Sequence, residues 1–289
     1  MTILRKVVPE IRLHPILFVF IIISFLTGTF VSLFVIMTIV LIHELGHYLM
    51  AAFFRWRIRR VMIWVFGGVM DTDEHGTKPL YQEILVTIAG PFQHLVIYLL
   101  LILFLQLQFI PHSMVELAFF YNSVILLFNL LPIWPLDGGK LLFLLLSSRL
   151  AYRKAYNWVI LFSMFVCMLG LIVQLFFISF TLSSFVLFMF LLMENRTDWK
   201  QRYYVFIRFL LRRYYGQTYV KGVLPIEVSH NCGLMNVFSK FHREKKHPIY
   251  ITYPGSMRRS IDEMDCLYSY FHERHFRRTV GEVDSYIVK

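Results

Sequence analysis

Charged residues are scarce in this chain. They make up 16% of 289 residues, while hydrophobic residues make up 57%, against about 25% charged residues in ordinary globular proteins. Lys and Arg are absent from Leu13 to Phe54 and again from Ala155 to Asn195. Long apolar stretches without these charges are typical of membrane-spanning helices. The composition therefore excludes an ordinary soluble domain and indicates an integral, multi-pass membrane protein.

Cysteine is scarce too, with 3 residues and no CxxC pair. An odd, scattered set favours reduced thiols and argues against a thiolate metal site. A cleavable signal peptide is not expected, because the first apolar segment lacks a small-residue cleavage site and leads into a second apolar run that carries His and Glu.

Taking about 20 apolar residues for one crossing, the sequence predicts about six transmembrane helices. We place them near Pro15–Leu26, Phe30–Phe54, Gln82–Leu107, Val115–Leu131, Tyr156–Phe176 and Phe180–Met193. An even number of spans puts both termini on one side, and that side receives all the basic loops. Because cytoplasmic loops carry the excess of Lys and Arg, both termini are expected to be cytosolic.

Three domains are predicted: 1–195 in the membrane, a basic amphipathic linker at 196–221, and a cytosolic α/β domain at 222–289. The linker interleaves basic and aromatic residues, which is typical of a helix on an anionic membrane surface and equally of a stalk. In the last domain, strands are expected at Pro225–Val228 and Pro248–Tyr253, and helices at Asn231–His242 and Asp262–His272.

The second span contains His43-Glu44-Leu45-Gly46-His47. Residues four apart share a helix face, so both imidazoles can reach one metal ion with Glu44 beside them. Ionisable residues inside a membrane are costly and usually functional. The alternative is a polar patch between helices or part of a proton path.

A catalytic zinc site needs a third protein ligand and an open position for water. Glu83, Glu116 and Glu194 lie at the edges of predicted spans, whereas Asp137 follows a segment rich in Pro and Gly after the fourth span. Such a segment breaks a helix and can turn a carboxylate inward. Asp137 is therefore the expected third ligand, and an ordinary cytoplasmic turn is the alternative.

Together, HELGH and NLLPIWPLDGG resemble the site-2 family of intramembrane metalloproteases. The resemblance implies that His43, His47 and Asp137 bind one Zn²⁺ per chain and that Glu44 activates water. It further implies that Asn129, Pro132 and Pro135 shape the substrate and transition-state environment.

Four further segments, FFRWRIRRV, FGG, DEHG and AGPFQH, are similar to the sporulation proteases of this family. This similarity implies cleavage of the N-terminal pro-sequence of a membrane-associated sigma K precursor in the mother-cell membrane surrounding the forespore. It also implies inhibitory membrane partner proteins, contact with lipid, and no direct nucleic-acid partner.

The tail resembles a single cystathionine-beta-synthase (CBS) module, a unit that often binds adenine nucleotides such as ATP and usually works in pairs. One copy per chain implies a homo-oligomer. A docking platform without a ligand is the alternative.

Phe66, Gly67 and Gly68 lie between two β-branched and aromatic segments, which predicts a hairpin. The resemblance suggests a re-entrant β element that binds extended substrate through these residues, and a plain loop is the alternative. His94, in the third span, has no acidic neighbour at ligand spacing and is interpreted as a helix-packing or interface residue.

Intramembrane His and acidic residues also suit a metal or proton transporter. Transport predicts polar residues spread over several spans and internal repeats, whereas here they concentrate in two motifs. Glu44 disfavours an inactive scaffold. The sequence therefore favours proteolysis, either of the sigma K type or with another membrane-protein substrate.

Overall fold

The structure, a computed structural model, describes residues 10–13, 15–64, 67–72, 76–176, 181–254 and 258–287. The chain divides into two compact units. The first takes the described residues up to Thr72, Tyr81–Pro132 and Leu136–Leu141. The second takes Gly76–Leu80, Ile133–Pro135 and the described residues from Leu142 onward.

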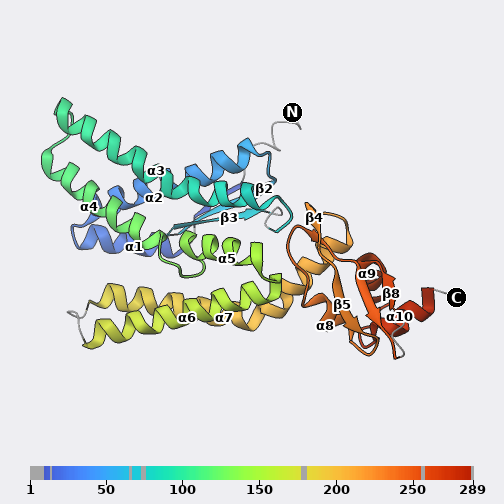
Figure 1. Cartoon of the computed structure of the whole chain (residues 1–289). Helices are drawn as coiled ribbons and strands as arrows, with labels where there is room; N and C mark the ends of the chain where they lie inside the picture. Colours follow the sequence, from blue (N-terminus) through green and yellow to red (C-terminus); the bar gives the residue numbers. More distant parts are fainter. Residues whose placement is uncertain are drawn as a thin grey trace. The chain divides into compact units, whose positions relative to one another are not determined.

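The first unit is built on apolar helices, α1 (Pro15–Leu26), α2 (Phe30–Phe53), α3 (Leu80–Leu107) and α4 (His112–Asn129). Helix α2 contacts both α1 and α4 (Figure 1). Ile39 of α2, Ile97 and Leu101 of α3, and Val115 of α4 form a buried cluster. Apolar contacts thus hold the helix that carries HELGH against its neighbours.

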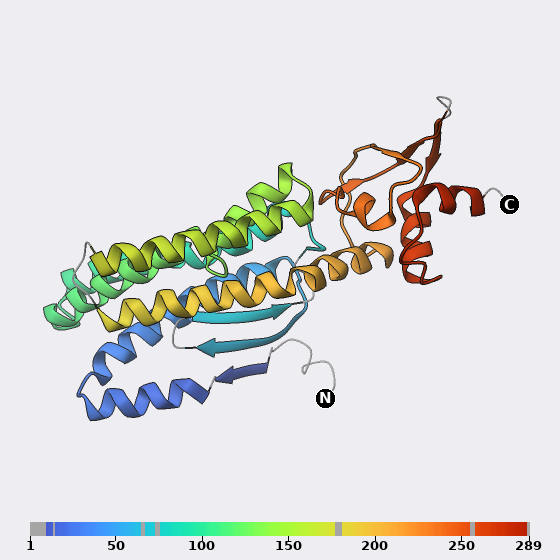
Figure 2. The same cartoon turned by 90° about the horizontal axis from the view of Figure 1, so that it is seen from below.

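A small sheet accompanies these helices. Strand β1 (Glu10–Leu13) pairs in parallel with β2 (Ile58–Trp64), and β2 pairs antiparallel with β3 (Gly67–Thr72). The blue and teal arrows in Figure 2 are these strands. The predicted hairpin is confirmed as β2–β3, while β1 was not predicted. Among the described strands β3 lies at an edge of the sheet, and it contacts α2.

The chain after α4 departs from the prediction. Asp137 is not in a turn but is the first residue of a helix, α5 (Asp137–Arg149), which the sequence did not predict. Helix α6 (Tyr152–Phe176) begins four residues before the predicted span. The last predicted span and the basic linker helix are one continuous helix, α7 (Leu182–Tyr214).

Within the second unit, α6 and α7 lie side by side (Figures 1 and 2). The basic end of α7 buries Phe206, Phe209, Leu210 and Arg213, which is the i, i+3, i+4, i+7 stripe of a helix packed against protein. Phe209 stacks on Tyr152 of α6, with ring centroids 4.1 Å apart. This buried stripe therefore faces protein, which favours the interpretation of the basic segment as a stalk over its interpretation as a helix on the membrane surface.

The tail is an α/β fold, as predicted. Its main sheet has the order β5 (Ile226–Ser229), β7 (Ile249–Thr252) and β8 (Arg258–Ile261), and β4 (Gly222–Val223) pairs with β6 (Lys245–Lys246). Alternate residues of β5 and β7 are buried, so one face of the sheet packs inward. The helices are α8 (Leu234–Phe238), α9 (Glu263–Phe271) and α10 (Val280–Ile287); α8 is much shorter than the predicted helix at Asn231–His242.

Three described helices, α2, α3 and α6, are long and apolar enough to cross a membrane. Helix α1 is apolar but short, and α7 has 33 residues of which the second half is basic. At about 1.5 Å per residue α7 is roughly 50 Å long, longer than the hydrocarbon core of about 30 Å. The six-span count and the boundaries of the three domains stay predictions.

Candidate metal centre

Helix α2 brings His43 and His47 together one turn apart, as their spacing predicts. Their Nε2 atoms lie 3.1 Å from each other, and the side chains are almost fully buried. Glu44 is half-buried beside them, and potential ligand atoms of the three residues lie within 4.8 Å of one another. The HELGH motif therefore forms one compact polar group inside the first unit.

Asp137 completes this group from the start of α5. Its Oδ2 lies 3.1 Å from His43 Nε2 and 3.0 Å from His47 Nε2. The other oxygen, Oδ1, accepts a hydrogen bond of 3.2 Å from Lys140 Nζ, one turn further along α5. Lys140 was not singled out in the sequence, although its i+3 spacing from Asp137 could have suggested the pair.

Small residues make this convergence possible. A Cβ on Gly138 would collide with the carbonyl oxygens of Leu130 and Leu131, so a side chain there would keep α5 from approaching the end of α4. A Cβ on Gly90 of α3 would collide with Nε2 and Cε1 of His47 and lie 2.8 Å from Cε1 of His43. Gly90 therefore leaves open the space that both imidazoles face.

The donor set fits zinc. Two imidazole nitrogens and a carboxylate oxygen are a known set of ligands for catalytic zinc. Ligand atoms about 2.0–2.1 Å from a tetrahedral zinc lie roughly 3.3 Å from one another, and the three atoms here are separated by 3.0–3.1 Å. Lone pairs brought this close repel each other unless a cation or a proton lies among them. His43, His47 and Asp137 could therefore hold the metal.

The Nδ1 atoms of His43 and His47, which point away from the metal centre, also have hydrogen-bond partners. His47 Nδ1 lies 2.8 Å from the carbonyl oxygen of Val86. His43 Nδ1 lies 3.1 Å from His94 Nε2, and His94 Nδ1 lies 2.7 Å from Oδ1 of Asn122. The interpretation of His94 as a mere packing residue was thus incomplete, and Asn122 was missed. Polar residues inside apolar spans are the feature that could have drawn attention to both.

The predicted substrate residues lie around the approach to Asp137 and at β3. Asn129 ends α4 and donates a hydrogen bond of 3.1 Å to the Ile125 carbonyl, while Pro132 and Pro135 are half-buried in the following segment. Gly67 and Gly68 begin β3, opposite Trp64 and Ile63 of β2. Phe66 lies outside the described residues.

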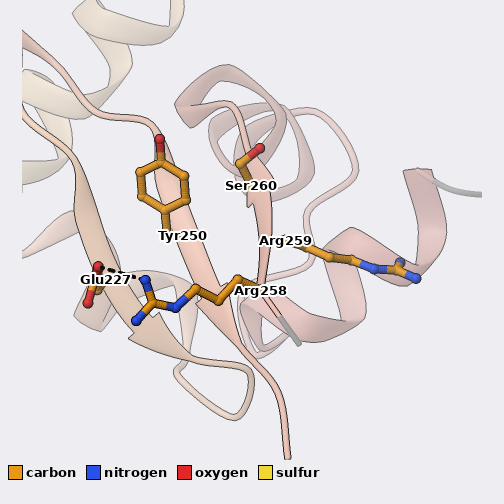
Figure 3. Close-up of a pocket in the computed structure, with 5 residues that line it drawn as sticks. All are labelled: Glu227, Tyr250, Arg258, Arg259 and Ser260. Carbon is orange, nitrogen blue, oxygen red and sulfur yellow. Dashed lines mark ion pairs between the residues drawn. The ribbon is translucent and has the colours of Figure 1, made fainter. Parts of the chain in front are cut away.

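The tail has a shallow pocket of about 230 Å³ lined by Glu227, Tyr250, Arg258, Arg259 and Ser260 (Figure 3). Arg258 lies 3.9 Å from Glu227, and Arg259 pairs with Asp284 at 3.3 Å. Pockets that enclose a small molecule usually measure about 300–1,000 Å³. This pocket would leave much of a nucleotide in solvent.

A second buried polar cluster lies in the second unit, which also contains this pocket. Nε and Nη2 of Arg213 donate to both oxygens of Glu263, at 3.1 and 3.0 Å, and Nη1 donates to the His242 carbonyl. The His247 backbone N–H donates to Glu263, and its ring Nε2 accepts from the His242 N–H at 2.7 Å. Burial and the Arg213 charge lower the pKa of His247 to about 3. This cluster pairs each charge with its opposite and joins α7 to α9.

The His–Glu–His helix, the converging aspartate and the apolar helices around them are the arrangement expected of a membrane metallopeptidase. The comparisons agree with this class. The model of peptidase family M50 matches residues 31–112 and 106–170. Stage IV sporulation protein FB of Bacillus subtilis is 40% identical over 275 residues, which cover 95% of this chain and 96% of that protein.

A curated sequence and a solved structure from Methanocaldococcus jannaschii are also similar. A zinc metalloprotease of Methanocaldococcus jannaschii is 29% identical over 119 residues, covering 40% of this chain and 34% of that protein. The solved structure of the site-2 protease from Methanocaldococcus jannaschii matches with a TM-score of 0.53 and 26% identity, covering 65% of this chain and 89% of that one. The chain belongs to the site-2 protease family of membrane metalloproteases, peptidase family M50. The family expected from HELGH and LDGG is confirmed, and the transporter alternative is set aside.

Proposed function

We propose that this chain is an intramembrane zinc endopeptidase that removes the N-terminal pro-sequence of a membrane-associated sigma factor precursor of the sigma K type during sporulation. The observation that carries the proposal is 40% identity to stage IV sporulation protein FB over nearly the whole of both chains. The convergence of His43, His47 and Asp137 supports the chemistry. Another membrane-protein substrate is the alternative.

His43, His47 and Asp137 would hold the zinc, and Glu44 would act as the general base. Zinc, when bound, lowers the pKa of a coordinated water toward about 7 and polarises the scissile carbonyl. Glu44 takes the proton of the attacking water and passes it to the departing amine, so one water is consumed for each C–N bond broken. Burial of the site limits the entry of bulk water, which strengthens the electrostatic interactions within it.

The test is cleavage of a purified sigma K precursor by the full-length protein in liposomes. Glu44→Gln should lower the rate by about 10²- to 10⁴-fold, the usual contribution of a general base, and keep close to one zinc per chain. Glu116→Gln is the control, because Glu116 is an exposed carboxylate at the start of α4. A Glu44→Gln variant that cleaves at the normal rate would refute the assigned mechanism.

The substrate would bind in extended form along β3, with Gly67 and Gly68 at its start, and Phe66, the residue before them in the sequence, would take part. Asn129, Pro132 and Pro135 would act near Asp137. The edge position of β3 and its contact with α2 support this arrangement. A protease needs an accessible carbonyl, and strand addition supplies extended backbone.

Replacing Gly67 and Gly68 together by Val should lower cleavage strongly and leave the zinc content intact, because the side chains would keep the substrate backbone at a distance. The control is Gly222→Val in β4, where the atoms nearest an added Cβ belong to the flexible Lys245 side chain. Full cleavage by the double Val variant would exclude this binding mode.

Six spans with cytosolic termini fit the distribution of Lys and Arg. Accessibility labelling of a cysteine placed at His112 tests this arrangement, which requires that position to be reachable from the non-cytosolic side. By the similarity to the sporulation proteases, the protein would lie in the mother-cell membrane surrounding the forespore, in contact with lipid. Inhibitory membrane proteins would hold it inactive there.

The tail would act as a CBS-like module that pairs in a homo-oligomer and responds to ATP. The support is the resemblance, since the pocket lined by Tyr250 and Arg258 is small. Adding ATP to the liposome assay should raise the cleavage rate. A rate independent of ATP would leave the docking platform as the role of the module.

A further inference from the structure

A chain of side-chain hydrogen bonds leads away from the metal centre on the side of His43. It runs from His43 Nδ1 to His94 Nε2, and from His94 Nδ1 to Asn122 Oδ1. Asn122 also donates from Nδ2 to the backbone carbonyl of His94, at 3.1 Å. His94 and Asn122 are both fully buried, so solvent offers them no other partners.

The hydrogen bond from Asn122 Nδ2 to the His94 carbonyl fixes the position of every proton in this series of hydrogen bonds. A backbone carbonyl can only accept, so the amide of Asn122 must present its NH₂ to it and its oxygen to His94. That oxygen requires a proton on His94 Nδ1. Neutral His94 then has an unprotonated Nε2, which accepts the proton on His43 Nδ1.

The consequence lies at the other nitrogen of His43. With the proton held on Nδ1, Nε2 carries a lone pair, and this is the atom 3.1 Å from Asp137 Oδ2. His47 reaches the same state more simply, because its Nδ1 lies 2.8 Å from the Val86 carbonyl. One histidine is thus oriented by backbone and the other by two side chains from α3 and α4.

We propose that His94 and Asn122 are positioning residues that fix the tautomer and the ring orientation of His43 for metal binding. The inference rests on the proposed role of His43 as a zinc ligand. Under this proposal, metal affinity depends on two buried side chains, His94 and Asn122. In the described contacts, neither side chain comes within hydrogen-bond distance of the Asp137 carboxylate or the His47 ring. Partners of this kind are typically worth 10- to 100-fold in metal affinity.

The experiment measures zinc affinity rather than cleavage. The full-length protein in detergent is stripped of metal and titrated with Zn²⁺ against a chromophoric chelator. His94→Phe, which offers no acceptor to His43, should weaken binding by about 10- to 100-fold. The visible spectrum of bound Co²⁺ should change as well, because the orientation of one imidazole changes.

Two variants separate positioning from general damage. His94→Gln should restore much of the affinity, since its carbonyl can accept from His43 while its NH₂ donates to Asn122. Tyr98→Phe is the matched control, because the Tyr98 hydroxyl bonds Ser123 at 2.7 Å between the same two helices, one turn from His94. This control should keep the zinc affinity and the cobalt spectrum of the wild type.

Asn122→Leu should resemble His94→Phe, and combining the two should add little, because both break the same chain of hydrogen bonds. If the wild type binds zinc and His94→Phe or Asn122→Leu binds it equally tightly, the inference is wrong while the proposed function stands. If the wild type binds no zinc, the proposed function itself fails. Should His94→Phe not fold, a His94→Gln variant no tighter than Asn122→Leu would overturn the inference.

Discussion

The two buried polar clusters of this protein differ in how their charges meet. In the first unit, two imidazole nitrogens and a carboxylate oxygen converge at 3.0–3.1 Å, so acceptors face acceptors. In the second unit, the guanidinium of Arg213 faces the carboxylate of Glu263 with two hydrogen bonds. The first arrangement directs three lone pairs at one point, whereas the second directs donors at acceptors.

This difference distinguishes a metal-binding site from a cluster that only stabilises the fold. Buried charges are tolerated where they are paired and hydrogen-bonded, and Arg213–Glu263 meets that condition with protein atoms alone. In the first cluster Lys140 pairs with Oδ1 of Asp137, but Oδ2 and the two Nε2 atoms face one another and would meet the condition through a metal ion or a proton. Burial and polarity are shared by the two clusters, so only the direction of the lone pairs shows which one is suited to bind a metal.

The largest effect is expected when a single methyl group, added at Gly90, fills the space between the histidines of the first cluster. Gly90→Ala would place Cβ against both His47 and His43, so at least one imidazole must turn away. We expect loss of zinc, measured by elemental analysis, and loss of cleavage. In the control, Gly170→Ala on α6, the atoms nearest the added Cβ belong to the ring of Phe188. Normal zinc content in a folded Gly90→Ala protein would contradict the model of the centre.

The second prediction breaks the other cluster. Arg213→Met leaves Glu263 buried without its cation, which typically costs about 3–5 kcal/mol. Hydrogen exchange of the amides in β5 and β7, measured on the full-length protein, should show faster opening, while the zinc content stays close to one per chain.

The matched variant removes both charges. Arg213→Met combined with Glu263→Leu should cost clearly less than the sum of the single changes, since no buried charge is left unpaired. Simple additivity would show that Arg213 and Glu263 do not stabilise each other as the geometry indicates.

The sequence predicted the first cluster better than the second. His43 and His47 were recognisable because helical periodicity is local and puts i and i+4 on one face. Asp137 was found by elimination and resemblance, although its place at the start of α5 was not. The contact between His43 and His94 joins residues 51 positions apart, and no periodic pattern encodes such a distance.

The fold was predictable to a similar degree. The apolar helices and two strands of the tail, β5 and β7, followed from composition and alternation, whereas β4, β6 and β8 were not predicted. The continuous α7 was not, because its apolar and basic halves have the compositions of two different elements. Strand β1 was missed since its partner, β2, lies about fifty residues further along the chain. Arg213 was grouped with the other basic residues of the linker, and its burial depends on a glutamate 50 positions away.

The smallest expected effect concerns His247, which lies beside Arg213 and Glu263. Its Nε2 accepts a hydrogen bond from the His242 N–H, so the folded module requires the neutral ring. Burial and the charge of Arg213 lower its pKa to about 3, below the value of about 6.5 in an unfolded chain. Glu263 Oε2 lies 3.9 Å from Nδ1, too far for a hydrogen bond that would favour the charged ring.

Because the folded pKa is the lower one, His247 contributes stability above pH 6.5 that is lost as the pH falls toward 3. The loss should approach about 1.4 kcal/mol per pH unit for one proton. Hydrogen exchange of the β5 and β7 amides between pH 7 and 4.5, corrected for intrinsic rates, measures it. In His247→Gln, whose carbonyl can still accept from His242, the part of the slope due to this residue should disappear. Equal slopes in the two proteins would mean that other groups, such as Asp262 and Glu273 with their lowered pKa values, account for the acid sensitivity of the module.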